Sequence, residues 1–346
     1  MTSRFAALGL AVCGLVSLSG ANGASAADQQ TLTISVYGIS QEGFKKDLYT
    51  PFEAICGCKL VVDAGNSAER LARLEARKDD PVVDVAALAD FSALEAAHKG
   101  LIEPVDTSKL ANLGKLYEFA RDPLGGHLAV GYTFYATSIV YRSDKLKIDS
   151  WADLLAPTLR DRLALPNITT TQGPLTLFML DRALGGQSPD FATAIDKVAE
   201  AKHDIVTFYE RSAQLNQLLQ QGDVWASVTG RFGWGSIHKL SVPIAWAEPK
   251  EGQTGGMNVL TVVKGSKNRE LALKFIDFWL SDAVQMALAM DGFDSPANAG
   301  VKVPPEIAEN LTYGADTVKH LHLMDPADVL ANRDAWLAAW NAKVAN

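Results

Sequence analysis

The segment "HLAVGYTFYATSIVYR", residues 127 to 142, is a long β-like run in a chain whose neighbouring strand-like runs are short. Aromatic and β-branched side chains fill it, and both types favour strands. A strand of this length can leave one sheet and enter another. A second long β-like run, "GGMNVLTVVKGS" at 255–266, is also long enough to pass from one sheet to another. We therefore expect two lobes joined by crossing strands.

Strand-like and helix-like patterns alternate on both sides of these runs. The segment "PVVDVAAL" at 81–88 is almost entirely apolar, which indicates a strand buried on both faces. Helical periodicity over 42–55 places four apolar residues on one face: Phe44, Leu48, Phe52 and Ile55. The pattern predicts an α/β fold in which each lobe is a mainly parallel sheet flanked by helices. A ligand cleft is then expected between the lobes, where strands end and helices begin.

The first 26 residues read as a leader rather than as part of the fold. An apolar run over 5–18 is too short to span a membrane, and Ala24-Ser25-Ala26 fits a cleavage signal. We expect a signal peptide over 1–26, a cleaved mature chain and export to the periplasm.

Charge and cysteine content narrow the possible partners. Cleavage would leave 31 basic and 40 acidic residues, a net charge of −9. This acidity argues against nucleic acid or an anionic membrane as a partner. Cys56 and Cys58 remain, and in an oxidising compartment they can form a strained local disulfide or stay as two thiols. Neither has further ligands at zinc-like spacing, so no metal site is expected.

Catalytic motifs are missing from the sequence. It contains no GxSxG, no GxxxxGK[ST], no HExxH and no dinucleotide fingerprint after the first strand. The six histidines are scattered, and the paired acids lie in segments where acids usually cap turns. A periplasmic enzyme that uses the same cleft is therefore the weaker alternative, and we expect neither enzymatic activity nor a cofactor.

The stretch "GDVWASVTGRFGWGS" at 222–236 carries the most distinctive chemistry. A short apolar strand over 224–228 ends in Arg231, which stands with Phe232 and Trp234 among three glycines. A guanidinium can grip a carboxylate or phosphonate with two hydrogen bonds, and the rings can stack on a ligand. Arg231 can equally pair with a structural acid. The loop "NITTTQGP" at 167–174 adds hydroxyls and helix N-terminal amides, which also favour an anionic group.

Five segments together resemble a known family. They are "FEAICGCKLVVD" (52–63), "ALEAAHKGLIEPVDTSKLANL" (93–113), "SIVYRSDKLKIDSWADLLAPTLRDRLALPN" (138–167), "LLQQGDVWASV" (218–228) and "VVKGSKNRELALKFIDFWLSDAVQMALA" (262–289). Over nearly the whole mature chain, the sequence resembles the periplasmic solute-binding proteins of ABC importers. The resemblance is to the group that contains the spermidine/putrescine-binding proteins and their iron- and phosphonate-binding relatives.

The resemblance implies a type II-like two-lobed fold that closes around one small-molecule ligand. It implies that the protein, a monomer, delivers this ligand to an ABC permease in the inner membrane. By the family pattern, one lobe comprises 28–135 and 257–302, and the other comprises 136–256 and 303–346.

Two departures from the family pattern bear on the ligand. A carboxylate and an aromatic residue flank the second crossing in the polyamine members, where this chain has Asn258 and Gly256. An amide cannot replace the charge of a carboxylate, and this weakens the case for a doubly charged amine as the ligand. A pair of tyrosines in the iron members corresponds to Arg231 and Phe232. Ferric iron prefers anionic oxygen ligands, so arginine argues against it.

The leading interpretation is an exported protein that binds a small amine-containing organic solute. A polyamine and an amino-acid-like compound such as γ-aminobutyrate both fit. The alternative is a phosphonate or other organic anion held by Arg231. Glu42 and Asp294 are candidate counter-charges for an ammonium group. The full set of candidate ligand-binding residues is Tyr37, Glu42, Asn66, Phe91, Tyr132, Phe134, Thr170, Thr171, Arg231, Phe232, Trp234, Asn258, Phe293 and Asp294.

Overall fold

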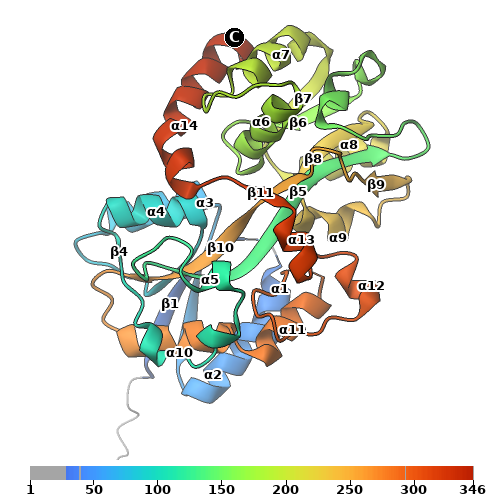
Figure 1. Ribbon diagram of the computed structural model, residues 1–346. Coiled ribbons are helices and arrows are strands. Elements are labelled where there is room, and N and C mark those ends of the chain that lie inside the picture. Colours follow the sequence, from blue (N-terminus) through green and yellow to red (C-terminus); the bar gives the residue numbers. More distant parts are fainter. Residues whose placement is uncertain (1–28, 39, 293, 346) are drawn as a thin grey trace, which may run out of the picture.

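The computed structural model describes residues 29–38, 40–292 and 294–345. They form a two-lobed α/β fold (Figure 1). The expected signal peptide, 1–26, lies outside the described residues. Within the described residues, no helix has the length and apolar character needed to cross a membrane.

The described residues contain strands of very different length. They are β1 (Thr31–Val36), β2 (Lys59–Ala64), β3 (Val85–Ala89), β4 (Ile102–Glu103), β5 (Val130–Arg142), β6 (Leu163–Pro166), β7 (Ile205–Tyr209), β8 (Ala226–Gly230), β9 (Ile244–Trp246), β10 (Gln253–Val263) and β11 (Leu321–Leu323). These strands pair in one mixed sheet in the order β2-β1-β3-β10-β5-β8-β6-β7. Strands β4 and β11 pair with β10, and β9 pairs with β5.

Helices cover the two ends of this sheet (Figure 1). They are α1 (Gln41–Phe44), α2 (Thr50–Cys56), α3 (Ser67–Ala76), α4 (Asp90–His98), α5 (Glu118–Arg121), α6 (Gln172–Ala183), α7 (Ala192–Ala201), α8 (Ser212–Gln221), α9 (Trp234–Ile237), α10 (Arg269–Trp279), α11 (Asp282–Met290), α12 (Pro305–Ala308), α13 (Ala315–Lys319) and α14 (Pro326–Trp340). The longest, α14, runs along one side of the molecule and contacts both α4 and the α7 region (Figure 1).

Strands β5 and β10 cross between the two halves, as the sequence predicted. The first part of β5 pairs with β10 and its last part pairs with β8, and Thr137 pairs with a residue of each. These central pairs are antiparallel, whereas β1 pairs in parallel with β2 and β3, and β6 pairs in parallel with β7 and β8. Apart from the short β11, which pairs in parallel with β10, parallel pairing lies in the outer strands, because the two crossing strands run in opposite directions.

Buried apolar side chains form two large clusters, one on each side of the crossing. The first draws on 32–132 and 257–297, and the second on 139–247 and 329–344. The lobe boundaries, 28–135 with 257–302 and 136–256 with 303–346, remain our proposal. The tail is divided between the two lobes, because Val301 and Leu311 pack with Ala289 of α11, whereas Trp336 stacks on Phe191 at 4.5 Å.

The predicted helix over 42–55 is interrupted by a π-helical turn at Lys45–Tyr49. A π turn adds a residue and rotates the downstream face. Tyr49 and Phe52 consequently face the core, while Ile55 is 70% exposed, contrary to the expected face. After this helix, Cys56 and Cys58 are joined by a disulfide.

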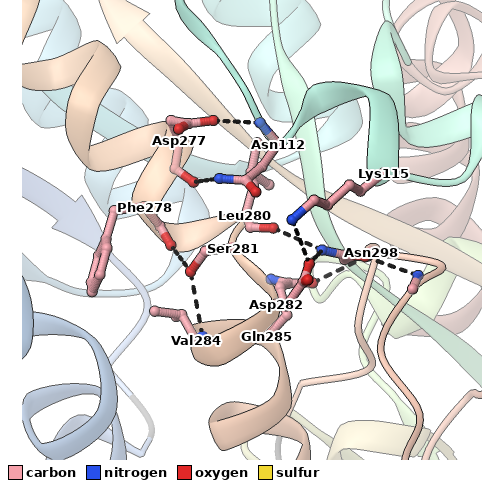
Figure 2. Close-up of polar contacts among 11 residues, drawn as sticks. Asn112, Lys115, Asp277, Phe278, Leu280, Ser281, Asp282, Val284, Gln285 and Asn298 are labelled. Carbon is pink, nitrogen blue, oxygen red and sulfur yellow. Dashed lines mark hydrogen bonds and ion pairs between the residues drawn. The ribbon is translucent and has the colours of Figure 1, made fainter.

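The turn after α11 is held in place by buried amide side chains (Figure 2). Asn298 donates hydrogen bonds from Nδ2 to the carbonyl of Leu280 (3.1 Å) and to Oδ1 of Asp282 (2.7 Å). Gln285 accepts a 2.9 Å hydrogen bond from the amide of Ala297 through Oε1. It also donates from Nε2 to the carbonyl of Tyr132, on the crossing strand β5. The segment that carries Asp294 is thereby tied to α11 and β5.

Candidate ligand-binding site

Two adjoining cavities lie beside the crossing strands. The larger has a volume of about 890 Å³ and the smaller about 210 Å³. Their linings come from both halves of the chain, and the two cavities share Asn66, Ser67, Tyr135, Thr171, Gln172 and Phe232. A ligand that occupies them would therefore contact both lobes.

Asp294 is a buried carboxylate in the wall of the smaller cavity. Its side chain is 5% exposed, and Oδ1 accepts a 2.8 Å hydrogen bond from the hydroxyl of Tyr37. Oδ2 is buried and makes no hydrogen bond of normal geometry to any described residue. Burial raises the pKa of Asp294 to about 7, although the hydroxyls of Tyr37 and Thr133 favour the charged form. An acceptor of this kind is suited to a cationic hydrogen-bond donor.

Most of the sequence-predicted site residues come together around these cavities. The structure places Phe91, Thr170 and Thr171 on the larger cavity, and it places Tyr37, Asn66, Phe134, Thr171, Arg231, Phe232, Asn258 and Asp294 on the smaller one. Asn66 and Phe232 also line the larger cavity. Phe293 lies outside the described residues.

Three predicted residues line neither cavity. Glu42 is exposed in the first turn of α1, so it faces solvent rather than the cleft. Tyr132 is fully buried, with its ring 4.6 Å from that of Trp279, because its position on β5 faces the first core. Trp234 begins α9, where its ring packs 5.9 Å from Trp246. The structure corrects the expectation that these three side chains face a ligand.

Arg231 lines the smaller cavity, but its guanidinium is largely engaged by the protein. Nη2 donates to the carbonyl of Glu309, and the guanidinium lies 4.5 Å from the ring centre of Trp246. Its Nε is buried without a hydrogen-bond partner among the described residues. Burial lowers the pKa of Arg231 to about 10, so it remains charged at neutral pH. The pairing is with a backbone carbonyl and an indole face, rather than with the structural acid considered from the sequence.

The glycines beside Arg231 serve packing within the protein. The ring of Phe232 folds back over Gly230, where an added Cβ would lie 2.2 Å from a ring carbon. An added Cβ at Gly235 would lie 3.3 Å from the carbonyl oxygen of Gly292, at the end of α11. These glycines therefore allow the end of β8 and α9 to approach other parts of the chain.

Two of the predicted polar ligands already have structural partners. Asn66 caps α3, because its Oδ1 accepts from the amide of Glu69 at 2.9 Å in a capping box. Thr170 donates from its hydroxyl to the carbonyl of Asn167 at 2.7 Å. Both still border the cavities, and the larger part of their hydrogen bonding holds local structure.

Asp90, Gln172 and Arg70 are among the polar lining residues that sequence reasoning missed. Asp90 follows β3 and begins α4, and burial raises its pKa to about 6. Gln172 begins α6, and Arg70 stands on the buried face of α3, where it is 1% exposed. A polar residue directly after an apolar strand was the available signal for Asp90. Arg70 donates to the carbonyls of Gly65 and Ala87, so its role is mainly structural.

The fold and the cleft define the protein as a solute-binding protein. The family model described as "Bacterial extracellular solute-binding protein" matches residues 47–315, and the chain belongs to this family. It is 26% identical over 326 residues to "Iron uptake protein A1" of Synechocystis sp., covering 88% of this chain and 87% of that protein. It is 26% identical to the "Spermidine/putrescine-binding periplasmic protein" of Salmonella typhimurium, covering 84% of this chain and 85% of the relative.

Solved structures show the same architecture. An ABC transporter structure from Clostridium perfringens superposes with a TM-score of 0.79 at 29% identity, covering 90% of this chain and 99% of the other. The family consists of solute-binding proteins and not enzymes, and the chain is a substrate-binding component of the ABC transporter class.

Proposed function

We propose that this protein captures a small amine-containing organic solute, a polyamine or an amino-acid-like compound, in the periplasm. The ammonium group binds Asp294 in the smaller cavity. The lobes close around the solute, and the protein, a monomer released from its signal peptide, delivers it to an ABC permease.

The observation that carries this proposal is the buried Oδ2 of Asp294, which makes no hydrogen bond of normal geometry to a described residue. A buried acceptor without a donor costs free energy, and a charged one costs more. A ligand ammonium would supply the missing donor and the opposite charge at once. Tyr37 holds the other oxygen at 2.8 Å, so the open oxygen has a defined position.

Aromatic walls around this carboxylate suit the carbon chain of such a solute. Phe134 and Phe232 line the smaller cavity, and the ring of Phe232 meets that of Tyr135 edge-on at 5.1 Å. Rings of this kind can cover methylene groups and attract a cation. The spermidine/putrescine-binding relative supports the same ligand class.

A second candidate, an organic anion without an ammonium group, has one observation in its favour. Arg70 and Arg231 both line the smaller cavity and give it positive charge. Such an anion would leave the open oxygen of Asp294 unpaired and would add a second negative charge beside it. The amine-containing solute therefore ranks first.

A thermal-shift screen of the ligand-free mature protein tests the proposal. The panel contains putrescine, spermidine, γ-aminobutyrate, 2-aminoethylphosphonate, thiamine and ferric citrate. A ligand at a hundredfold excess over its Kd adds about 2.7 kcal/mol to stability, which gives a clear rise in Tm. We expect the rise with amines, and we expect Asp294→Asn to abolish it. Stabilisation by anions alone, unchanged in Asp294→Asn, would overturn the proposal.

A further inference from the structure

Gln172, the first residue of α6, presents a buried donor whose hydrogen bonding is poorly satisfied. Its side chain is 6% exposed and lines both cavities. Oε1 accepts a 2.7 Å hydrogen bond from the hydroxyl of Thr137, which orients the amide. Nε2 is buried and makes no hydrogen bond of normal geometry to any described residue, although it lies close enough to the hydroxyl of Tyr135 to interact with it. A buried donor in a cavity wall whose hydrogen bond is poorly satisfied is suited to an acceptor from the ligand.

The backbone around Gln172 also favours an anionic or acceptor group of the ligand. Helix α6 runs over Gln172–Ala183, where Pro174 has no N–H and the amide of Gly173 already donates to the hydroxyl of Thr170 at 3.2 Å, so the helix start contributes chiefly through its dipole. The helix dipole adds partial positive charge at this end, so an anion is stabilised there. Gly173 lets the loop pack closely against the helix start, since an added Cβ would lie 2.3 Å from the carbonyl oxygen of Asn167. The side-chain donor and the helix start therefore form one anion-binding end of the cavity.

The charges of the smaller cavity argue against two ammonium groups. Arg70 and Arg231 line it together with the single carboxylate Asp294. A diamine would bring two further positive charges to this wall, whereas a zwitterion would bring none in total. From Asp294 and Gln172, which border the same cavity, we infer that the solute is a short ω-amino acid. Its ammonium binds Asp294, and its carboxylate binds Gln172 at the start of α6. This inference rests on the proposed function and specifies the second pole of the solute.

Asp90 is the rival partner for the second pole, because it would bind an ammonium. It lines only the larger cavity, and its oxygens accept from the amides of Phe91 (2.8 Å) and Met257 (3.4 Å). In the sheet, Ala89 pairs with Asn258, which pairs with Thr133, which bridges to Pro296. Three strand spacings amount to about 14 Å, which is longer than a four-carbon chain. This spacing is between backbones, and Asp90 is absent from the lining of the smaller cavity, whereas Gln172 borders that cavity together with Asp294. We therefore assign the second pole to Gln172.

Four probes of equal carbon length test the inference by calorimetry on the ligand-free mature protein. γ-Aminobutyrate carries an ammonium and a carboxylate, and putrescine carries two ammonium groups. n-Butylamine carries one ammonium group and butyrate carries one carboxylate. We expect γ-aminobutyrate to bind at least about tenfold more tightly than each of the others, because only it satisfies both ends.

Gln172→Glu is the matched variant, since it keeps an acceptor for Thr137 and replaces only the donor with an anionic oxygen. We expect the variant to bind γ-aminobutyrate at least about tenfold more weakly and putrescine more tightly, while its affinity for n-butylamine changes little. The comparison of probes on the unaltered protein keeps the test valid if the variant does not fold.

The outcomes separate the two proposals. Putrescine binding as tightly as γ-aminobutyrate, with both lost in Asp294→Asn, would overturn the carboxylate end and keep the amine site. Butyrate binding as tightly as γ-aminobutyrate would overturn the amine site as well. No binding of any probe would also count against both proposals.

Discussion

The hydroxyl of Tyr37 donates a 2.8 Å hydrogen bond to Oδ1 of Asp294, across 257 positions of the sequence. Tyr37 follows β1, and Asp294 lies in the turn after α11. The bond occupies one carboxylate oxygen, while the other, Oδ2, makes no hydrogen bond of normal geometry to a described residue, although the hydroxyl of Thr133 lies close enough to favour the charged form. The pair therefore fixes the position of the carboxylate and leaves Oδ2 as the acceptor of the proposed ammonium site.

Asp294→Asn should remove binding of amines while keeping the fold. Asparagine retains an acceptor for Tyr37 but lacks the charge. We expect the affinity for γ-aminobutyrate to fall at least about 30-fold, since truncating one partner of a buried charge pair costs about 2 kcal/mol or more. Calorimetry measures the loss of affinity. Because the substitution removes a costly buried charge, we expect Tm of the free protein to stay the same or rise.

Asp291→Asn is the matched control for that variant. Asp291 lies three positions earlier, pairs with Lys46 at 3.2 Å, and has a side chain that is 35% exposed. Its replacement should leave the affinity unchanged. An equal loss of affinity in both variants would show that the effect reflects the turn rather than the carboxylate of Asp294.

Stability and affinity should respond to pH in opposite directions. The pKa of Asp294 is raised from 3.8 to about 7 in the folded protein, and that of Asp90 from 3.8 to about 6. The folded state thus binds these protons more tightly than the unfolded state. Their contribution to the free energy of unfolding is fully present below about pH 4 and is lost as the pH rises through 6 to 7. Urea denaturation of the free protein between about pH 5 and pH 8 should show this fall.

Binding of an ammonium group requires the charged form of Asp294. The affinity for γ-aminobutyrate should therefore weaken as the pH drops below about 7, by up to about tenfold per pH unit. Calorimetry across the same pH range measures this, and Asp294→Asn should flatten the profile. A profile that stays steep in the variant would assign the titration to another group.

Arg231→Ala should weaken ligands of all charges to a similar degree and lower Tm. The guanidinium joins the end of β8 to the carbonyl of Glu309, whose neighbour Leu311 packs with α11, so it spans the cleft. Arg231→Lys should restore little, because an ammonium cannot reproduce planar stacking on Trp246. Calorimetry with γ-aminobutyrate and n-butylamine measures the loss of affinity for each ligand, and the two losses can then be compared. A loss confined to γ-aminobutyrate, with Tm unchanged, would instead show that Arg231 grips the ligand carboxylate.

Gln285→Leu should destabilise the protein strongly and disorder the turn that carries Asp294. Gln285 is 1% exposed, accepts from the amides of Ala297 and Asn298, and donates to two carbonyls. Leucine would leave several buried backbone groups unpaired, at a cost of about 1–3 kcal/mol each. Thermal unfolding measures the effect, with exposed Gln187→Leu as the control. Equal Tm values for the two variants would refute this role.

Local patterns in the sequence were sufficient for much of the fold. The apolar run before Asp90 and the length of β5 both depend on residues close together in the chain, and the structure contains both strands. The family resemblance placed Asn258 beside the second crossing, and the end of the strand over 224–228 placed Phe232 near the cleft; both line the smaller cavity. Helical periodicity failed at Ile55, because the π turn shifts the helical phase without a mark in the apolar spacing.

Within the site, periodicity located strand ends and helix starts but not the direction of each side chain. Glu42 and Asp294 were equal candidates as counter-charges, yet one is exposed and the other is buried. Arg231 was placed at the cleft, and its engagement by Glu309 depends on a segment 78 positions away.

The sequence by itself determined the alternation of strands and helices, the two crossing runs and the family, because these follow from local periodicity and ordered motifs. Only the tertiary structure decided which polar atoms remain unpaired in the cleft. The open oxygen of Asp294 and the open amide of Gln172 depend on what surrounds them after folding, since burial and distant partners set both the pKa and the hydrogen bonding. Those two atoms belong to segments more than a hundred positions apart, and packing of the two lobes around β5 and β10 places them on one cavity.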